Sequence, residues 1–275
     1  MGIKKHLILM TIILLLLAGR VNAGGNDREI INTGPWTIDE LNILIFKASK
    51  IKDSAERIAF ISRQFLSLPY QEKTLVGGVQ TPEVFTIHLL GVDCFTLLDY
   101  VAAMQLSASF DDFKRNLKKI RYQSGIVDYQ RRNHFFTDWI EFNSNLVTDV
   151  TKQIDPANTR KVTKTLNDVV LNKQLLPGVA PRKREISYIP GEAVNEDVVR
   201  GLKTGDYVGI YSHRPDLDVS HVGIVIRLGN KLLFRHASSV NRHKKVIDED
   251  FMKYVSNKPG IIVIRQMKLG SDLEY

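Results

Sequence analysis

The sequence has almost no cysteine. Cys94 is the single one among 275 residues, so an intramolecular disulfide cannot form, and a zinc site made of several cysteines is not expected. Internal repeats and low-complexity tracts are lacking as well. Apolar residues make up 44% of the chain and charged residues 25%, which is typical of a globular protein. This composition excludes collagen-like, fibrous and wholly disordered chains.

The apolar run near the start of the chain is too short to cross a bilayer. Leu7–Ala18 has 12 residues, whereas a membrane-spanning helix needs about 20. Two lysines precede the run and Val21-Asn22-Ala23 follows it, which is the pattern of a cleaved signal peptide. We expect a signal peptide over residues 1–23 and an exported protein, periplasmic or secreted, with no stable membrane span after cleavage. An uncleaved N-terminal anchor is the alternative.

Strong charge of one sign is also lacking. The net charge is +8, and loss of the signal peptide would remove three basic residues and leave +5. The basic residues occur in scattered pairs and are not interleaved with aromatic residues, as they are in proteins that bind single-stranded nucleic acid. We therefore expect no nucleic-acid partner. The basic pairs are typical of a solvated surface, which could hold an anionic polymer of the cell envelope.

Helical patterns fill the first half of the chain. Thr37-Ile38-Asp39-Glu40 has the pattern of a capping box, and apolar residues follow it at helical spacing. Further helices are expected over 54–66, after Asp93 and over 109–122. A loop is expected around residues 77–82, where glycine and proline cluster.

Strand patterns fill the last 75 residues, and Gly229-Asn230 predicts the tight turn of a hairpin. Strands are expected over 207–211, 221–228, 231–237 and 261–267. A helical half followed by an antiparallel sheet predicts an α+β fold. Residues 123–195 mix aromatic residues with breaks at proline and glycine, and we expect loops and short helices there that form a wall over a site.

Cys94 stands at the start of a predicted helix. Apolar residues recur at helical spacing from Leu97 to Leu106, and Asp93 is a candidate N-cap. Backbone N–H groups and the helix dipole favour a thiolate at this position. Exported proteins normally pair their cysteines or lack them. We therefore expect a reactive thiol with a lowered pKa, and a buried, inert cysteine is the alternative.

Two histidines share one face of the predicted hairpin. With a two-residue turn at Gly229-Asn230, His221 and His236 are diagonal neighbours on that face, and Gly223 opposite His236 leaves room for an imidazole. This pattern predicts a reaction centre in which Cys94 is the nucleophile. His221 would take its proton and later protonate the leaving amine, and His236 would orient the His221 ring.

Other interpretations of these residues stay open. The two histidines could be unrelated strand residues, or they could bind zinc together with Cys94, although no ligand spacing supports zinc. We expect neither a metal nor a cofactor. A transglutaminase-like centre would instead use Asp248 or Asp250 as its third member. The remaining histidine of interest, His134, is either a core residue or a substrate contact.

Short motifs follow one another in a recognisable order along the chain. They are Leu68-Pro69-Tyr70, Gly77-Gly78, Val92-Asp93-Cys94, Lys203-Thr204-Gly205-Asp206, Ser220-His221-Val222-Gly223-Ile224 and His236-Ala237-Ser238. This set resembles the NlpC-type cell-wall hydrolases, which are papain-like cysteine peptidases. Two further stretches, Asn133–Trp139 and Leu217–Gly223, resemble the N-acetylmuramoyl-L-alanine amidase-like branch of that family.

The resemblance implies a papain-like fold with the nucleophile at a helix N-terminus packed on the C-terminal sheet. Residues 24–275 would form a single catalytic domain, with a family-specific segment around 123–195. The implied reaction hydrolyses the amide between N-acetylmuramic acid and L-alanine in peptidoglycan or muropeptides, through a Cys94-His221-His236 triad and a thioester. Soluble fragments fit better than intact wall, because no wall-anchoring module is present. The implied substrate contacts are Tyr70, Asp93, His134, Asp138, Trp139 and Ser220.

Two functions remain as alternatives to the amidase. A cell-wall endopeptidase on the same fold would cut within the stem peptide, and only the shape of residues 123–195 would distinguish it. A non-catalytic wall-binding module would use Cys94 as a structural residue, and a free thiol at a helix start argues against it.

Overall fold

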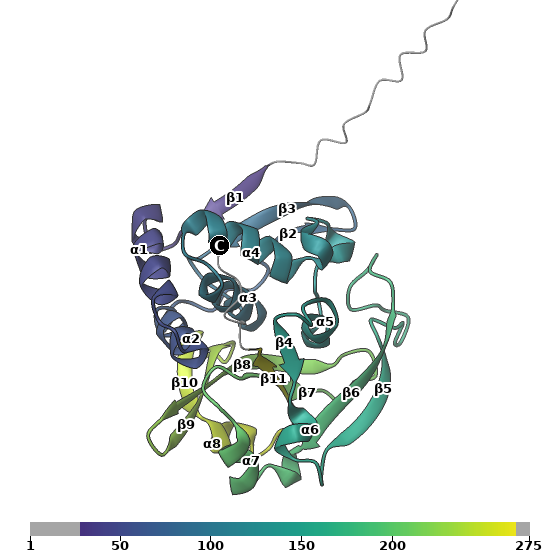
Figure 1. Ribbon diagram of the computed structural model, residues 1–275. Coiled ribbons are helices and arrows are strands. Elements are labelled where there is room, and N and C mark those ends of the chain that lie inside the picture. Colours follow the sequence, from purple (N-terminus) through teal and green to yellow (C-terminus); the bar gives the residue numbers. More distant parts are fainter. Residues whose placement is uncertain (1–27, 268–275) are drawn as a thin grey trace, which may run out of the picture.

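The computed structural model describes residues 28–267, and the expected signal peptide lies outside them. It has a mixed α+β architecture (Figure 1). The helices are α1 (Ile38–Ser49), α2 (Ser54–Arg63), α3 (Cys94–Gln105), α4 (Phe110–Arg121), α5 (Phe136–Phe142), α6 (Thr151–Ile154), α7 (Glu196–Gly201) and α8 (Phe251–Val255). Short 3₁₀ turns occupy Gln123–Gly125, Tyr129–Arg131 and Gly191–Ala193.

The strands form two sheets. They are β1 (Glu29–Asn32), β2 (Val76–Gly78), β3 (Thr81–His88), β4 (Val147–Asp149), β5 (Arg160–Leu166), β6 (Arg182–Pro190), β7 (Tyr207–Tyr211), β8 (Val219–Leu228), β9 (Lys231–Ser238), β10 (Lys245–Asp250) and β11 (Gly260–Gln266). The large sheet has the order β10-β9-β8-β7-β11-β6-β5, and β4 pairs with β11 beside this path. Its strand pairs are antiparallel. The small sheet has the order β1-β3-β2.

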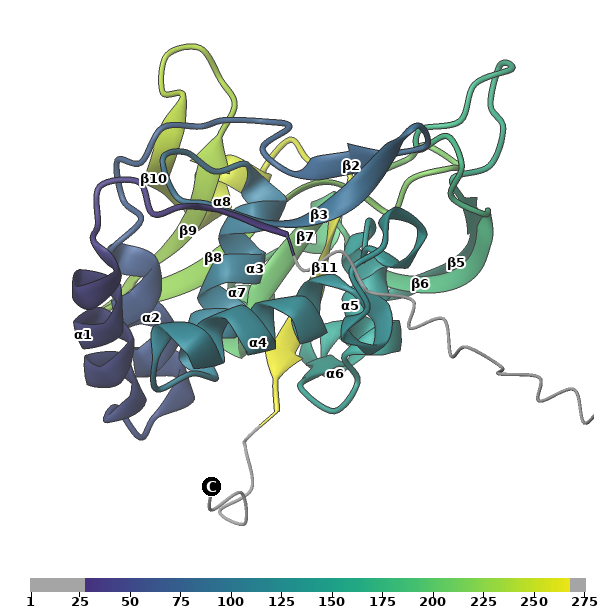
Figure 2. The same ribbon diagram turned by 90° about the horizontal axis from the view of Figure 1, so that it is seen from above.

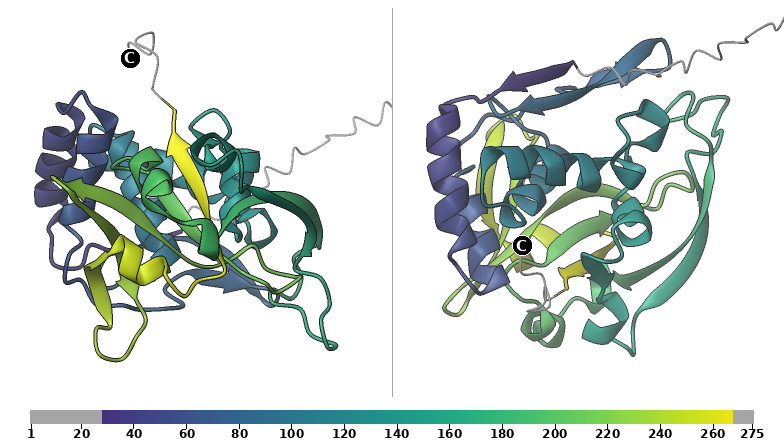
Figure 3. Two further views of the ribbon diagram at one scale, coloured as in Figure 1. Left: turned by 90° about the horizontal axis from the view of Figure 1, so that it is seen from below. Right: turned by 45° about the horizontal axis from the view of Figure 1, so that its top comes forward.

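Helices cover both faces of the large sheet (Figures 1 and 3). On one face, Val222 and Ile224 of β8 belong to the main core with residues of α1 to α5. On the other face, Val225 of β8 belongs to a smaller core with residues of α7 and α8. Because side chains alternate along a strand, β8 is apolar on both sides and sits rigidly between two layers. The small sheet lies across the outer side of α3 and α4 (Figure 2).

The helix starts that the sequence predicts are confirmed. Thr37 and Glu40 form a capping box at α1, in which the Thr37 backbone N–H donates to Glu40 Oε2 over 2.8 Å. Asp93 caps α3 and Ser109 caps α4. These side chains satisfy N–H groups that the first helical turn leaves without an intrahelical partner.

The loop expected around residues 77–82 is wrong, because β2 and β3 form a hairpin there. Pro82 is compatible with β3 because the parallel pairing of β3 with β1 begins only at Phe85, so the missing N–H of the proline is not needed on that side. The glycines that suggested a loop belong to the short edge strand β2.

The expectation for residues 123–195 is wrong in part. The short helices are present, but β5 and β6 pair over their full length from Arg160↔Tyr188 to Leu166↔Arg182. Consecutive charged residues, at 160–161 and 182–185, conceal this hairpin in the sequence. The intervening Val162 and Ile186 face the core, as strand alternation requires.

Candidate active site

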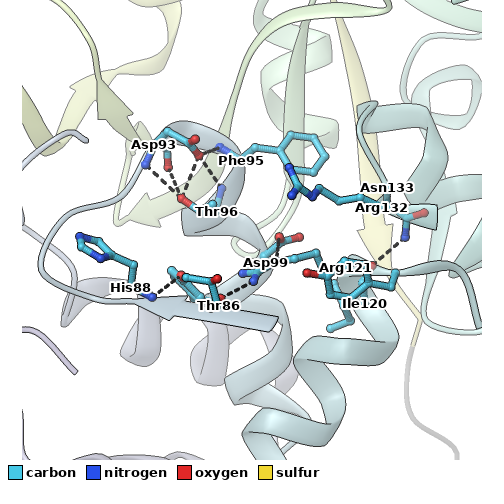
Figure 4. A network of polar contacts seen from close by, with 12 residues as sticks. Thr86, His88, Asp93, Phe95, Thr96, Asp99, Ile120, Arg121, Arg132 and Asn133 are labelled. Atoms are coloured by element: carbon cyan, nitrogen blue, oxygen red, sulfur yellow. Dashed lines mark hydrogen bonds and ion pairs between the residues drawn. The ribbon is translucent and has the colours of Figure 1, made fainter. Parts of the chain in front are cut away.

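Cys94 is the first residue of α3, and Asp93 holds the chain in place before it. One carboxylate oxygen of Asp93 accepts the backbone N–H of Phe95 over 3.0 Å and that of Thr96 over 2.7 Å. The Thr96 hydroxyl lies 3.0 Å from the backbone N–H of Asp93 and accepts from it (Figure 4). This reciprocal cap fixes the start of the helix, and therefore the position of the Cys94 side chain, against a helix body that is largely buried.

The thiol of Cys94 is half-buried and protonated at neutral pH. Burial, and after it the negative charge of Asp93, raise its pKa to about 12. The backbone N–H groups of Val222, Cys94 and Phe95 act in the opposite direction but are outweighed. The expected lowering of the thiol pKa is therefore wrong for the free protein, because desolvation and the capping carboxylate exceed the effect of the helix terminus.

The two predicted histidines meet on the hairpin of β8 and β9. Nε2 of His221 lies 2.7 Å from Nδ1 of His236, and the two rings are nearly perpendicular, at 87°. The pairing of Leu228 with Lys231 confirms the two-residue turn. The prediction that these histidines are neighbours on one face is confirmed.

A third side chain, which sequence reasoning missed, completes this row. Nε2 of His236 lies 2.9 Å from a carboxylate oxygen of Glu249, on the neighbouring strand β10. The acidic residues considered from the sequence have other roles: Asp248 forms an ion pair with Arg235, and Asp250 caps α8. The connection between β9 and β10 has no two-residue turn, so the sequence contains no signal for the register that brings Glu249 to His236.

Both imidazoles are neutral at pH 7. Burial lowers the pKa of His221 to about 3, with smaller contributions in the same direction from His236 and Lys258. Burial also lowers the pKa of His236, while Glu249 raises it in part. A buried imidazolium is costly unless a charge compensates it, and only His236 has a carboxylate partner.

The helix start and the histidine pair are neighbours in the fold. Helix α3 packs against β8 and β9, and the N–H that points at the Cys94 sulfur belongs to Val222, the residue after His221. Tyr254 of α8 packs against both imidazoles, and the charge of a Cys94 thiolate would raise the pKa of its phenol. Among these described residues, no hydrogen bond joins the thiol to either imidazole, and their proximity follows from the packing of α3 on β8 and β9.

This arrangement can be compared with known proteins. Residues 60–261 match the family model described as AmiA-like, N-acetylmuramoyl-L-alanine amidase-like. The chain belongs to this family. A search of curated proteins finds no match.

Solved structures place the amidase-like chain among similar folds. A protein of Legionella pneumophila from the family DUF1460 is 24% identical, with a TM-score of 0.70 over 83% of this chain and 95% of that one, a likeness of fold. An N-acetylmuramoyl-L-alanine amidase of Bacteroides uniformis is 29% identical, with a TM-score of 0.65 over 83% of this chain and 100% of that one. A Bacteroides fragilis protein, provisionally named as a xylanase, is 29% identical with a TM-score of 0.62 over 74% and 98%.

Two predicted substrate contacts of this amidase-like chain border the site. Tyr70 is half-buried beside Val92, and its pKa is raised to about 12, first by burial and then by the charges of Cys94 and Asp93. Ser220 is exposed directly before His221. Asp93 is half-buried, and its Oδ1 accepts the capping hydrogen bonds while its Oδ2 makes none with residues 28–267.

The other predicted contacts lie in the α5 region. His134 is half-buried, and its Nε2 donates to the carbonyl of Tyr129 over 2.8 Å, which is the contact of a satisfied structural histidine. Burial lowers its pKa to about 4.

The prediction that Asp138 and Trp139 contact substrate is wrong. Asp138 is completely buried, between Arg182 at 3.1 Å and Arg184 at 2.8 Å. Trp139 is 1% exposed and packs edge-on against Phe95, one residue after Cys94. Helix α5 turns both side chains into the core, so these residues support the site through the core and do not line its surface.

In the part of the chain from 28 to 267, no three His, Cys, Asp or Glu side chains are grouped so that they could hold a metal ion. Over the same residues, no helix has both the length and the apolar character needed to span a bilayer.

Proposed function

We propose that the protein is a cysteine amidase of the NlpC, papain-like type, which hydrolyses the amide between N-acetylmuramic acid and L-alanine in soluble peptidoglycan fragments. Membership of the amidase-like family supports the substrate class. The observation that carries the chemistry is the 2.7 Å contact between His221 and His236 beside the helix start that bears the only thiol. A buried pair of imidazoles next to a cysteine is suited to move its proton.

The proposed reaction begins with proton transfer from the Cys94 thiol to His221. The sulfur forms a bond to the lactyl carbonyl carbon, and the carbonyl oxygen becomes an oxyanion. The backbone N–H of Cys94, at the helix start, is available to donate to that oxyanion. Both groups are neutral in the free protein, so the transfer separates charge. We expect this step to take place after the substrate has displaced water from the site.

The intermediate collapses by breaking the carbon–nitrogen bond. His221 returns its proton to the amine of L-alanine, which leaves, and the muramyl group remains on Cys94 as a thioester. A water molecule then gives a proton to His221 and attacks the thioester. The products are the muramic acid carboxyl group and the free thiol, so atoms and protons balance.

The role proposed for His236 is to orient His221 without exchanging protons with the substrate. Its ring is 2% exposed and packs between Phe234 and Tyr254, so it is held firmly. Tyr70 and Asp93 border the thiol and are proposed to contact the substrate, with Asp93 meeting the polar stem peptide through the oxygen that the helix cap leaves free.

Mass spectrometry of the products from a defined muropeptide tests this function. We expect the wild type to release a peptide that begins with L-alanine, together with a sugar that bears a free lactyl carboxyl group. Cys94→Ala should abolish release while circular dichroism shows an intact fold. A product in which L-alanine stays on the sugar would replace the amidase with the endopeptidase. Unchanged turnover by Cys94→Ala would refute the nucleophile.

We also propose that the protein works outside the cytoplasm, as a single catalytic unit released from residues 1–23. The basis is the lysine-flanked apolar run followed by Val21-Asn22-Ala23. Peptidoglycan fragments occur in the same compartment. N-terminal sequencing of the protein purified from an expressing bacterium should begin at Gly24, and a start at Met1 in a cytoplasmic fraction would contradict export.

A further inference from the structure

Glu249 ends a row of three side chains that crosses three neighbouring strands. The row runs from His221 on β8, through His236 on β9, to Glu249 on β10, with contacts of 2.7 and 2.9 Å. His236 is 2% exposed, whereas the Glu249 side chain is 26% exposed. The second oxygen of Glu249 lies 3.8 Å from the guanidinium of Arg242.

We propose that Glu249 is a positioning residue that selects the tautomer of both histidines and thereby leaves Nδ1 of His221 as the basic atom. This inference rests on the proposed function of the site. It concerns a residue that does not touch substrate and acts only through His236.

The direction of each hydrogen bond in the row is determined by the Glu249 carboxylate. An ionised carboxylate only accepts, so Nε2 of His236 must carry the hydrogen that it donates to Glu249. A neutral imidazole has one N–H, so Nδ1 of His236 is then an acceptor. Nε2 of His221 must donate to it over the 2.7 Å contact. His221 therefore has no hydrogen on Nδ1, and that nitrogen is free to take the proton of a thiol.

Without the carboxylate, the same row could be reversed. His236 could donate from Nδ1 to Nε2 of His221, and the hydrogen of His221 would then lie on Nδ1, where the base is needed. Both arrangements have the same number of hydrogen bonds between the rings, so the two imidazoles alone do not decide between them. The Glu249 carboxylate can only accept a hydrogen bond, so it favours the arrangement in which His236 donates from Nε2.

Few other groups face the pair. Among the described residues, the charged and titratable groups near the pair are Tyr254 from α8, Lys258 after α8, and His243 from the β9–β10 connection. Cys94 begins α3, which packs on β8 and β9, Arg242 lies beside Glu249, and Asp248 is on the opposite face of β10. Asp248 is already engaged with Arg235 over 2.7 Å. Glu249 is the acidic side chain in hydrogen-bond contact with an imidazole of the pair.

A purely structural role is not needed at this position. Strand β10 is held by its pairing with β9 from Lys245↔Ser238 to Asp250↔Leu233, and by the ion pair of Asp248 with Arg235. Loss of the Glu249 carboxylate leaves these contacts in place. Its removal should therefore affect catalysis more than folding.

The kinetic test compares Glu249→Gln with the wild type on a synthetic N-acetylmuramoyl dipeptide. The amide is nearly isosteric but can turn its NH₂ group toward His236, which favours the reversed row. We expect kcat to fall about 10- to 100-fold while KM stays within about twofold. Glu249→Asp, which restores an acceptor-only group, should recover part of kcat. The control is Glu185→Gln, the same change in an exposed ion pair with Lys161, and it should leave both constants unchanged.

A second measurement does not need turnover. Two-bond ¹H–¹⁵N correlation spectra of ¹⁵N-histidine-labelled protein distinguish imidazole tautomers. In the wild type we expect His221 and His236 to carry hydrogen on Nε2, and in Glu249→Gln we expect a population of His221 with hydrogen on Nδ1. Assignment uses His221→Ala and His236→Ala spectra.

The outcomes separate this inference from the proposed function. Wild-type kcat in Glu249→Gln, or the same tautomers in variant and wild type, would overturn the role of Glu249 while an active wild type keeps the amidase. A wild type with the expected tautomers that releases no L-alanine peptide would instead overturn the function and leave the tautomer assignment standing.

Discussion

At the scale of single residues, the site is assembled from neutral groups. Burial raises the pKa of the Cys94 thiol and lowers that of the His221 imidazole, so both shifts oppose a thiolate–imidazolium pair in the free protein. Two neutral groups cost less to bury than two charged ones when no close ion pair compensates them. The nucleophile is therefore expected to form during attack on the substrate.

This gives a prediction for the pH dependence of thiol alkylation. Because the pKa of Cys94 lies well above that of an ordinary thiol, the thiolate fraction should rise about tenfold per pH unit through pH 9. The rate of modification by iodoacetamide, measured from pH 5 to 10 with glutathione as the reference thiol, should therefore remain low at neutral pH. A plateau between pH 5 and 8 would reveal a preformed ion pair and contradict this picture.

The same residues illustrate what the sequence could predict about the site. His221 and His236 were accessible because a two-residue turn determines which strand positions face each other, and that rule needs only local sequence. Asp93 was accessible because an N-cap acts within one helical turn. The contact of Glu249 with His236 could not be predicted, because it depends on the register across the longer connection between β9 and β10. Nor could the raised pKa of Cys94 be predicted, because desolvation is set by groups distant in the chain.

At the scale of helices and strands, prediction succeeded for segments whose apolar residues follow a single pattern, either helical spacing or a strand-like apolar run. Helices α1, α2, α3 and α4 were found from capping residues and apolar spacing, and β7, β8, β9 and β11 from apolar runs. Strand β5 failed because basic residues stand on both of its faces, with Arg160 and Lys164 on the side of Val162 and Lys161 on the other, and β3 failed because it contains a proline. In each case burial decided the structure, and burial depends on the partner strand rather than on the segment itself.

A lysine of β5 also holds the connection that leads into β8, and the sequence of β5 does not predict this contact. Lys164 is 6% exposed, and its ammonium group donates to the carbonyls of Arg214 and Leu217 over 2.8 and 2.9 Å. These carbonyls belong to the connection from β7 to β8, which ends just before His221. The segment 123–195 therefore supports the β8 end of the site as well as forming part of the large sheet.

At the scale of the whole molecule, a buried ion pair and one further hydrogen bond link α3, the helix that begins with Cys94, to α4 and to the small sheet (Figure 4). Asp99 of α3 accepts from Arg121 of α4 over 2.9 Å, and both side chains are almost fully buried. Arg121 also donates to the carbonyl of Thr86 on β3 over 2.6 Å. One guanidinium thus connects two helices and the small sheet, and it holds the body of the helix whose first residue is Cys94.

Breaking this pair from one side should therefore destabilise the fold strongly and in a pH-dependent way. Burial raises the pKa of Asp99 to about 6 even though Arg121 opposes the rise, so Arg121→Met should raise it further. We expect a loss of about 3–5 kcal/mol at pH 7, where a buried carboxylate lacks its partner. Above the unfolded pKa of about 3.9, the native variant binds a proton that the unfolded chain does not, so its stability should fall as pH rises. Urea unfolding at pH 4 and pH 7 should show the smaller loss at pH 4.

The matched control removes both charges. In Asp99→Leu combined with Arg121→Met, no carboxylate remains to be desolvated. The Thr86 carbonyl loses a partner, at a cost of about 1–3 kcal/mol, and the Tyr100 ring loses the guanidinium that lies over it. The double variant should therefore be more stable at pH 7 than Arg121→Met alone and should show no such pH dependence. A double variant that is less stable than the single one would mean that the hydrogen bonds of this network, rather than the charge of Asp99, bind the helix layer to the small sheet.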